Sequence, residues 1–446
     1  MVNSRLLRLD RFWMPAFQRG LALLTVLCFA PLAPAGAQDA TGGSAGKDIE
    51  GVKEAVGVGD ADVVKPAPEH EPSRLPGSTV EVYGLAMLDM GFQSSQNDPA
   101  WFDVIRPTKL PAFENEFGRD GHLYSGVRQS RLGVKAFVPT RLGELSTIFE
   151  FELFGVGADA GQTTIRLRHA YGELGQFGAG QTWSPFMDID GFPNSIEYWG
   201  PNGMAFFRNV QVRWMPLKGD SRITLALERP GASGDQGDFA DRIELQNISG
   251  HFPAPDFSAE GRWGGDWGYV ELAGILRYLE WDDTLDDEFD LSGDGLGWGV
   301  NLSSNVNLGS QVLRLQGVYG EGIQNYMNDA PADVAPRLNP GDEVRPIEGD
   351  LLPLLGAMAF LDIKWNRWVT SSLGYSLLDI DNSDGQADEA FRRGHYALLN
   401  LLYYPVPGLM VGPEVQWGMR ENFRDDFNPQ DLRFQFSARY NFNFRL

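Results

Sequence analysis

The carboxy-terminal part of this chain alternates strictly between two kinds of side chain over residues 432–444. Every even-numbered residue there is apolar and every odd-numbered residue is polar, from Leu432 and Arg433 to Asn443 and Phe444. Successive side chains of a β-strand point to opposite faces, so one face of this segment suits an apolar environment and the other suits water. From Thr79 onward the same pattern predicts about sixteen strands, an even number as in bacterial outer-membrane barrels.

The remaining sequence favours a membrane barrel over a soluble sandwich. Mean hydropathy is -0.25, and the best apolar run after the amino terminus, residues 354–361, is far shorter than the ~20 residues of a membrane helix. Strands in hydrocarbon must pair all their backbone groups, so the sheet has to close on itself. Short turns also alternate with long polar loops. We therefore predict an all-β fold, a transmembrane antiparallel β-barrel of about 16 strands over residues 77–446.

The amino terminus has the features of an export signal. Four arginines precede an apolar run over residues 21–32, and Ala35-Gly36-Ala37 is typical of a cleavage site. We predict a signal peptide over residues 1–37 and a flexible periplasmic segment over residues 38–76, which is rich in Gly, Pro and acids. The only cysteine, Cys28, lies in the signal, so the mature chain has no disulfide. Export places the barrel in the cell outer membrane.

One irregular stretch, residues 180–204, interrupts the strand pattern. Its prolines and glycines oppose both helix and sheet, while its aromatic side chains are too apolar for a loop in water. We predict a constriction loop that folds into the mouth of the barrel. It carries three acids into the passage: Asp188, Asp190 and Glu197.

Charge is distributed unevenly along the chain. The formal net charge of -23 makes nucleic acid an implausible partner. Many acids lie in predicted loops such as residues 282–294. In the predicted strands, the alternation of side chains indicates that several arginines point into the lumen. The predicted basic side of the constriction consists of Arg131, Arg166, Arg168 and Arg213. Such charges can set solute preference, or the arginines can simply pair with strand glutamates such as Glu150 and Glu152.

Catalytic and metal signatures are weak. Residues 290–295 begin like a calcium loop, but Asn301 occupies the position that needs a bidentate glutamate. His122, His169, His251 and His395 have no Gly-x-Ser-x-Gly motif nearby. We predict no catalytic residue, no metal and no cofactor. A barrel enzyme acting on lipids, or a plugged structural or adhesive barrel, remains an alternative to a non-enzymatic diffusion channel.

Several motifs resemble, in the same order, those of the DcaP-like family of trimeric outer-membrane porins. They are residues 128–133 (RQSRLG), 166–171 (RLRHAY), 180–193 (GQTWSPFMDIDGFP), 197–203 (EYWGPNG), 265–268 (GDWG), 313–320 (LRLQGVYG), 412–416 (GPEVQ) and 420–422 (REN). The resemblance implies a homotrimer of sixteen-stranded barrels in outer-membrane lipid. It also implies passive uptake of small hydrophilic solutes, with a preference for anions such as dicarboxylates.

Overall fold

The structure is a computed structural model, and it describes residues 77–446. The signal peptide predicted over residues 1–37 and the segment predicted over residues 38–76 lie outside the described residues. Between residues 77 and 446 the chain forms β-strands, turns and seven short 3-10 helices. No helix in this range is long and apolar enough to cross a membrane.

One sheet contains 19 of the strands, and each of its strand pairs is antiparallel. Its strands are β1 (Thr79–Gln93), β2 (His122–Gly126), β3 (Arg131–Thr140), β4 (Gly143–Phe154), β5 (Thr163–Leu174), β6 (Phe177–Trp183), β7 (Arg208–Leu217), β8 (Arg222–Glu228), β9 (Ile248–His251), β10 (Asp256–Gly265), β11 (Gly268–Asp283), β12 (Gly293–Leu308), β13 (Gln311–Glu321), β16 (Pro353–Lys364), β17 (Val369–Ile380), β18 (Phe391–Asn400), β19 (Leu402–Val406), β20 (Leu409–Asn422) and β21 (Gln430–Arg445). A separate hairpin consists of β14 (Val334–Leu338) and β15 (Ile347–Leu351). The 3-10 helices are η2 (Pro99–Trp101), η3 (Pro107–Lys109), η4 (Gly157–Asp159), η5 (Ile189–Gly191), η6 (Gly237–Phe239), η7 (Ile243–Asn247) and η8 (Gln324–Tyr326).

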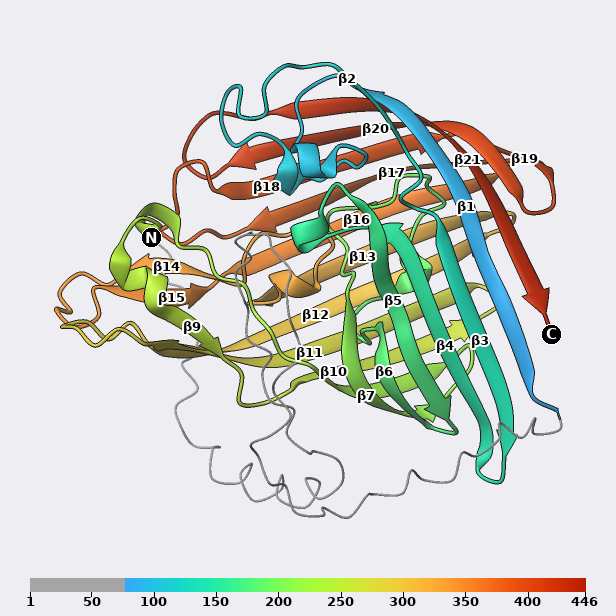
Figure 1. Cartoon of the computed structure of the whole chain (residues 1–446), viewed down its shortest axis with the longest axis horizontal. Helices are drawn as coiled ribbons and strands as arrows, with labels where there is room; N and C mark the ends of the chain where they lie inside the picture. Colours follow the sequence, from blue (N-terminus) through green and yellow to red (C-terminus); the bar gives the residue numbers. More distant parts are fainter. Residues whose placement is uncertain (1–76) are drawn as a thin grey trace, which may run out of the picture. The chain divides into compact units, whose positions relative to one another are not determined.

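Three strands of the barrel wall are interrupted. β2 and β3 both pair with β1, β9 and β10 both pair with β11, and β18 and β19 both pair with β17 and β20. Counted as one strand each, they give a wall of sixteen strands. The first and last strands close it, with β1 and β21 paired from Glu81 and Arg445 to Gln93 and Arg433 (Figure 1). The predicted sixteen-stranded barrel is confirmed.

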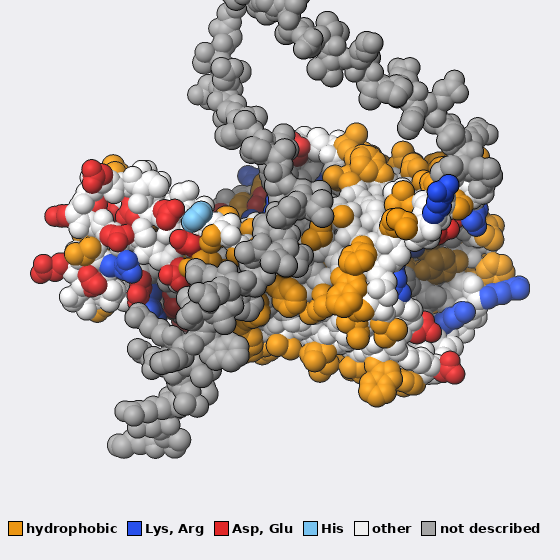
Figure 2. Space-filling model, turned by 90° about the horizontal axis from the view of Figure 1, so that it is seen from below, with side chains coloured by type: hydrophobic (Ala, Val, Ile, Leu, Met, Phe, Trp, Pro, Cys, Tyr) orange, Lys and Arg blue, Asp and Glu red, His pale blue; other side chains and the backbone are white. Residues whose placement is uncertain are grey.

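Side chains of the wall alternate between lipid and lumen. Leu132, Ile165 and Val212 are 50%, 73% and 55% exposed, while Arg433 and Ser437 are fully buried inside. Figure 2 shows the consequence on one face, where hydrophobic side chains cover much of the barrel and acidic ones gather in the loops beside it. The exposed apolar face matches hydrocarbon, which offers no partner for a polar side chain.

The two ends of the barrel differ in their connections. At one end the turns are short, as at residues 141–142 and 309–310, while at the other end connections run over residues 94–121, 184–207 and 322–333. These long segments fold back into the barrel rather than away from it. In the segment 184–207, Asn202 donates a hydrogen bond to the carbonyl oxygen of Gly394 in β18 at 2.9 Å, which places this segment against the wall.

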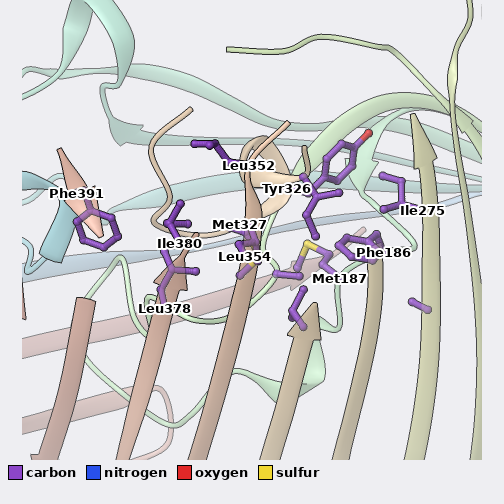
Figure 3. Close-up of a cluster of buried hydrophobic side chains, with 14 of the residues drawn as sticks. Phe186, Met187, Ile275, Tyr326, Met327, Leu352, Leu354, Leu378, Ile380 and Phe391 are labelled. Carbon is purple, nitrogen blue, oxygen red and sulfur yellow. The ribbon is translucent and has the colours of Figure 1, made fainter. Parts of the chain in front are cut away.

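An apolar core therefore lies inside the barrel, between the loops and the wall. Figure 3 shows Phe186 and Met187 of one loop beside Tyr326 of another, with Leu354 and Leu378 from the wall. Full burial of each such side chain contributes about 1.5–3 kcal/mol. On the wall, Gly299 makes room for the loop, because a Cβ there would lie only 3.0 Å from the Phe186 ring. This packing holds the long loops in place inside the barrel, where they narrow the passage.

Candidate functional site: the narrowed passage inside the barrel

The constriction loop comprises residues 184–207 between β6 and β7 and runs around the inside of the barrel. The predicted bounds, residues 180–204, were wrong at both ends, because residues 180–183 pair with β7 as the end of β6 and the loop continues to residue 207. Three hydrogen bonds tie it to different strands of the wall. Asn301 of β12 donates to the Phe186 carbonyl at 2.8 Å, the Ile196 amide donates to Glu414 of β20 at 2.9 Å, and the Gly203 amide donates to Ser376 of β17 at 2.8 Å. The inward-folded loop predicted from the sequence is therefore present and firmly attached.

Asp188 and Asp190 lie where the loop meets β10, β11 and β12. The carboxylate of Asp188 is fully buried and accepts hydrogen bonds from Tyr269 at 2.6 Å, from Ser303 at 2.7 Å and from Arg262 at 2.7 Å. Asp190, with a side chain 51% exposed, pairs with Arg262 at 2.6 Å. Asp188 thus fastens the loop to the wall, and Asp190 alone of the two offers an oxygen to the lumen.

Glu197 is buried behind the loop rather than exposed in the passage. Its carboxylate accepts hydrogen bonds from the backbone amides of Ile105, at 3.2 Å, and Gly200. Burial raises the pKa of Glu197 to about 8, although Arg433 and the Gly200 amide act in the opposite direction. At neutral pH this residue therefore adds little negative charge to the lumen.

Four arginines surround two glutamates on the inner face of β3, β4, β5 and β7. We call Arg131, Arg166, Arg168 and Arg208 the arginine wall. Arg168 is buried and lies 2.6 Å from Glu150, while its other nitrogen contacts Glu152. Arg131 approaches Glu152 to 3.4 Å, and Arg166 and Arg208 approach it to 3.6 Å. The arginines therefore pair with strand glutamates, as one interpretation of the sequence expected, and they outnumber those glutamates.

Arg213, the fourth basic residue in the sequence hypothesis, stands apart from this cluster. Its guanidinium donates to the Trp183 carbonyl at 2.8 Å and lies 4.8 Å from the Tyr171 ring centroid. Arg208 and Arg106, which parity did not select, are nearer to the passage. Arg208 precedes the alternating part of β7 and Arg106 lies in an irregular loop, so neither had a periodic signal.

Two cavities open on either side of the constriction loop. One, of about 300 Å³, is lined by Arg106, Arg166 and Arg208, and no acidic side chain lines it. The other, of about 590 Å³, lies toward the short turns and is bordered by Arg131 and Arg168. Tyr198 and Phe206 line both cavities, so these two rings lie between them. The Tyr198 ring stacks on Phe154 with centroids 3.9 Å apart.

Comparison with known proteins decides the family. The family model described as DcaP outer membrane protein matches residues 110–442, most of the barrel. The chain belongs to the DcaP outer membrane protein family. The family predicted from the sequence motifs is thereby confirmed, and with it the location in the outer membrane. The narrowed passage belongs to an outer-membrane channel.

Solved structures share the fold of this DcaP-family barrel. The outer membrane channel DcaP of Acinetobacter baumannii is 20% identical, with 82% of this chain and 98% of that chain covered and a TM-score of 0.68. OmpT of Vibrio cholerae is 13% identical over 82% and 98% of the two chains, with a TM-score of 0.51. An anion-selective porin from Comamonas acidovorans is 11% identical over 82% and 100%, with a TM-score of 0.50. No curated protein sequence matches the chain.

Proposed function

We propose that this channel passes small hydrophilic solutes by passive diffusion and favours anions such as dicarboxylates. The observation that carries the proposal is the excess of arginine beside the constriction loop. The arginine wall sets four positive charges against Glu150 and Glu152. Arg106 in the adjoining cavity is paired with the buried Asp329 at 2.8 Å, so the excess of positive charge comes from the arginine wall. Charged side chains at a constriction govern which ions enter.

The acidic total of the chain does not oppose this preference. Charges in water are screened over about 8–10 Å at physiological salt, so acids in outer loops act weakly at the constriction. The loop acids Asp188 and Glu197 are buried and hydrogen-bonded, which leaves Asp190 as the half-exposed one. The solved Comamonas acidovorans porin with the same fold is described as anion-selective, which is consistent with the proposal.

Reversal potentials in a planar bilayer test the proposal. Under a KCl gradient the wild-type channel should favour chloride over potassium. Replacing the part-exposed residues with R131Q and R166Q should lower this preference several-fold, because a unit charge at ~4 Å in water is worth about 1 kcal/mol. R242Q, in an exposed loop beside Glu244, is the matched control and should change nothing.

Three results would contradict the proposal. A wild-type channel that prefers potassium, and keeps that preference in the R131Q/R166Q variant, would reject anion selectivity. Purified, folded protein that never conducts would instead favour the plugged structural or adhesive barrel. Lipid hydrolysis by the purified protein would favour the barrel enzyme.

The proposal includes a homotrimer assembled after export. Its support is the family to which the chain belongs and the family motifs in the sequence. We expect the protein extracted in mild detergent to have about three times the protomer mass by light scattering, and amino-terminal sequencing to begin at Gln38. A monomeric mass before heating would reject the trimer, and a mature chain that starts at Met1 would reject the signal peptide.

A further inference from the structure

Three potential metal ligands meet on the outer surface of the barrel, at the end that carries the long loops. They are His251 of β9 and the acids Glu280 and Asp282 of β11. Sequence spacing predicts no metal site there, because the histidine and the acids are about thirty residues apart and separated by a turn. Their proximity is a product of strand pairing.

The register of β9 and β11 places the three side chains on one face. His251 is directly opposite Glu280 in the antiparallel pair, and Asp282 is two residues further along the same strand face. The outward side chains earlier in β11, such as Leu272 and Leu276, are 55% and 50% exposed and belong to the lipid face. Glu280 and Asp282 share their parity, so they continue that face beyond the apolar band toward the long-loop end.

The geometry suits a small cation. One ligand atom from each of the three side chains lies within 4.8 Å of the others, and His251 Nδ1 is 3.4 Å from a Glu280 carboxylate oxygen. Negative charge here has little compensation. Within residues 77–446, Glu280 has an ion pair only with His251 and Asp282 has none, while Asp294 of β12 is directly opposite Glu280 on its other side.

We infer that His251, Glu280 and Asp282 bind a divalent transition-metal ion, best matched by Zn²⁺. Imidazole nitrogen together with carboxylate oxygen is a donor set that Zn²⁺ accepts at about 2.0–2.2 Å, with a fourth tetrahedral position left for solvent. Small side-chain rotations bring the three atoms to that distance, since all three lie within 4.8 Å of one another. Because the ligands stand on paired strands, the scaffold itself holds them together.

The ion would act as a clip between the outer loop and the wall. β9 is four residues long and pairs with the wall only through residues 280–283 of β11. It ends the loop that follows β8, residues 229–247. A ligand that binds the paired state stabilises it by mass action, so the ion would hold β9 against β11.

Zinc titration of the untagged, full-length mature protein in detergent tests the inference. We expect one Zn²⁺ per chain by calorimetry. H251A, E280Q and D282N should each weaken binding by roughly tenfold or more, as loss of groups at a metal site does. H122A and E288Q, which replace exposed residues outside the cluster, should bind as the wild type does. H70A controls for the Glu69-His70-Glu71 sequence near the amino terminus.

A second measurement distinguishes a metal ion that holds β9 against β11 from nonspecific binding of cations to surface carboxylates. Zinc should slow amide hydrogen exchange at residues 248–251 in the wild type and leave it unchanged in H251A. Each variant is checked for the folded barrel by its altered gel migration before heating. Weak binding to several sites that H251A does not change, or binding that H70A abolishes, would overturn the inference.

Discussion

Replacing Glu152 by glutamine should make the channel more selective for anions and the barrel less stable. The Glu152 side chain is buried and lies within 3.6 Å of all four arginines of the wall. Glutamine keeps an oxygen that can accept the Tyr198 hydroxyl but loses the negative charge. One acid, Glu150, would then remain against four guanidinium groups. The chloride preference should rise several-fold, since a charge at ~4 Å in water is worth about 1 kcal/mol.

The stability effect of E152Q has a separate cause. Arg168 and Arg208 are buried, and a buried charge that loses its partner costs about 3–5 kcal/mol. Arg168 retains Glu150 at 2.6 Å, so the loss should fall toward the lower end. Urea unfolding in lipid vesicles measures it, and bilayer reversal potentials measure the selectivity. E173Q, whose partner Lys218 is exposed, is the matched control. Equal selectivity in E152Q and wild type would mean that Glu152 does not act on the permeating ions.

Replacing Gly203 by alanine should push the constriction loop away from the wall and narrow the passage. A Cβ on Gly203 would lie 2.0 Å from the Leu377 carbonyl oxygen and 2.8 Å from that of Ala357. Both are backbone atoms of the wall, held in place by the β16 and β17 pairing, so the loop has to yield. Its movement would break the hydrogen bond from the Gly203 amide to Ser376. Overpacking of this kind costs about 1–3 kcal/mol.

Single-channel recording measures the narrowing caused by G203A as a lower conductance and a noisier open level. G317A is the matched control, because Gly317 lies in β13 of the same wall and a Cβ added to it would have no neighbour within 4 Å. It should leave conductance unchanged. If G203A conducted like G317A, the attachment of residues 200–205 to the wall would not set the aperture.

The barrel follows from local pattern, whereas much of the site does not. Residues 432–444 identify β21 and its inward face without any knowledge of its partners. The same parity identified Arg131, Arg166 and Arg168, which do converge on Glu150 and Glu152. The same pattern also selected Arg213, which lies apart from this cluster in the folded barrel. The alternating pattern missed Arg106 and Arg208. Arg106 lies in an irregular loop and Arg208 is the first residue of a strand, so neither is part of an alternating run of side chains.

The order of the amino acids alone dictates which face of each strand meets lipid, because that choice depends on neighbouring residues a single position apart. It also marks a stretch at residues 180–204 as irregular, and of these only residues 180–183 join the sheet, at the end of β6. The destination of that loop depends on distant partners, as when Asp188 meets Arg262 and Tyr269, or Glu197 meets the Ile105 amide. Those contacts form only once sixteen strands have closed into a barrel. In the folded barrel, Asp188 and Glu197 therefore hold the loop in place, whereas Arg131, Arg166, Arg168 and Arg208 line the cavities beside it.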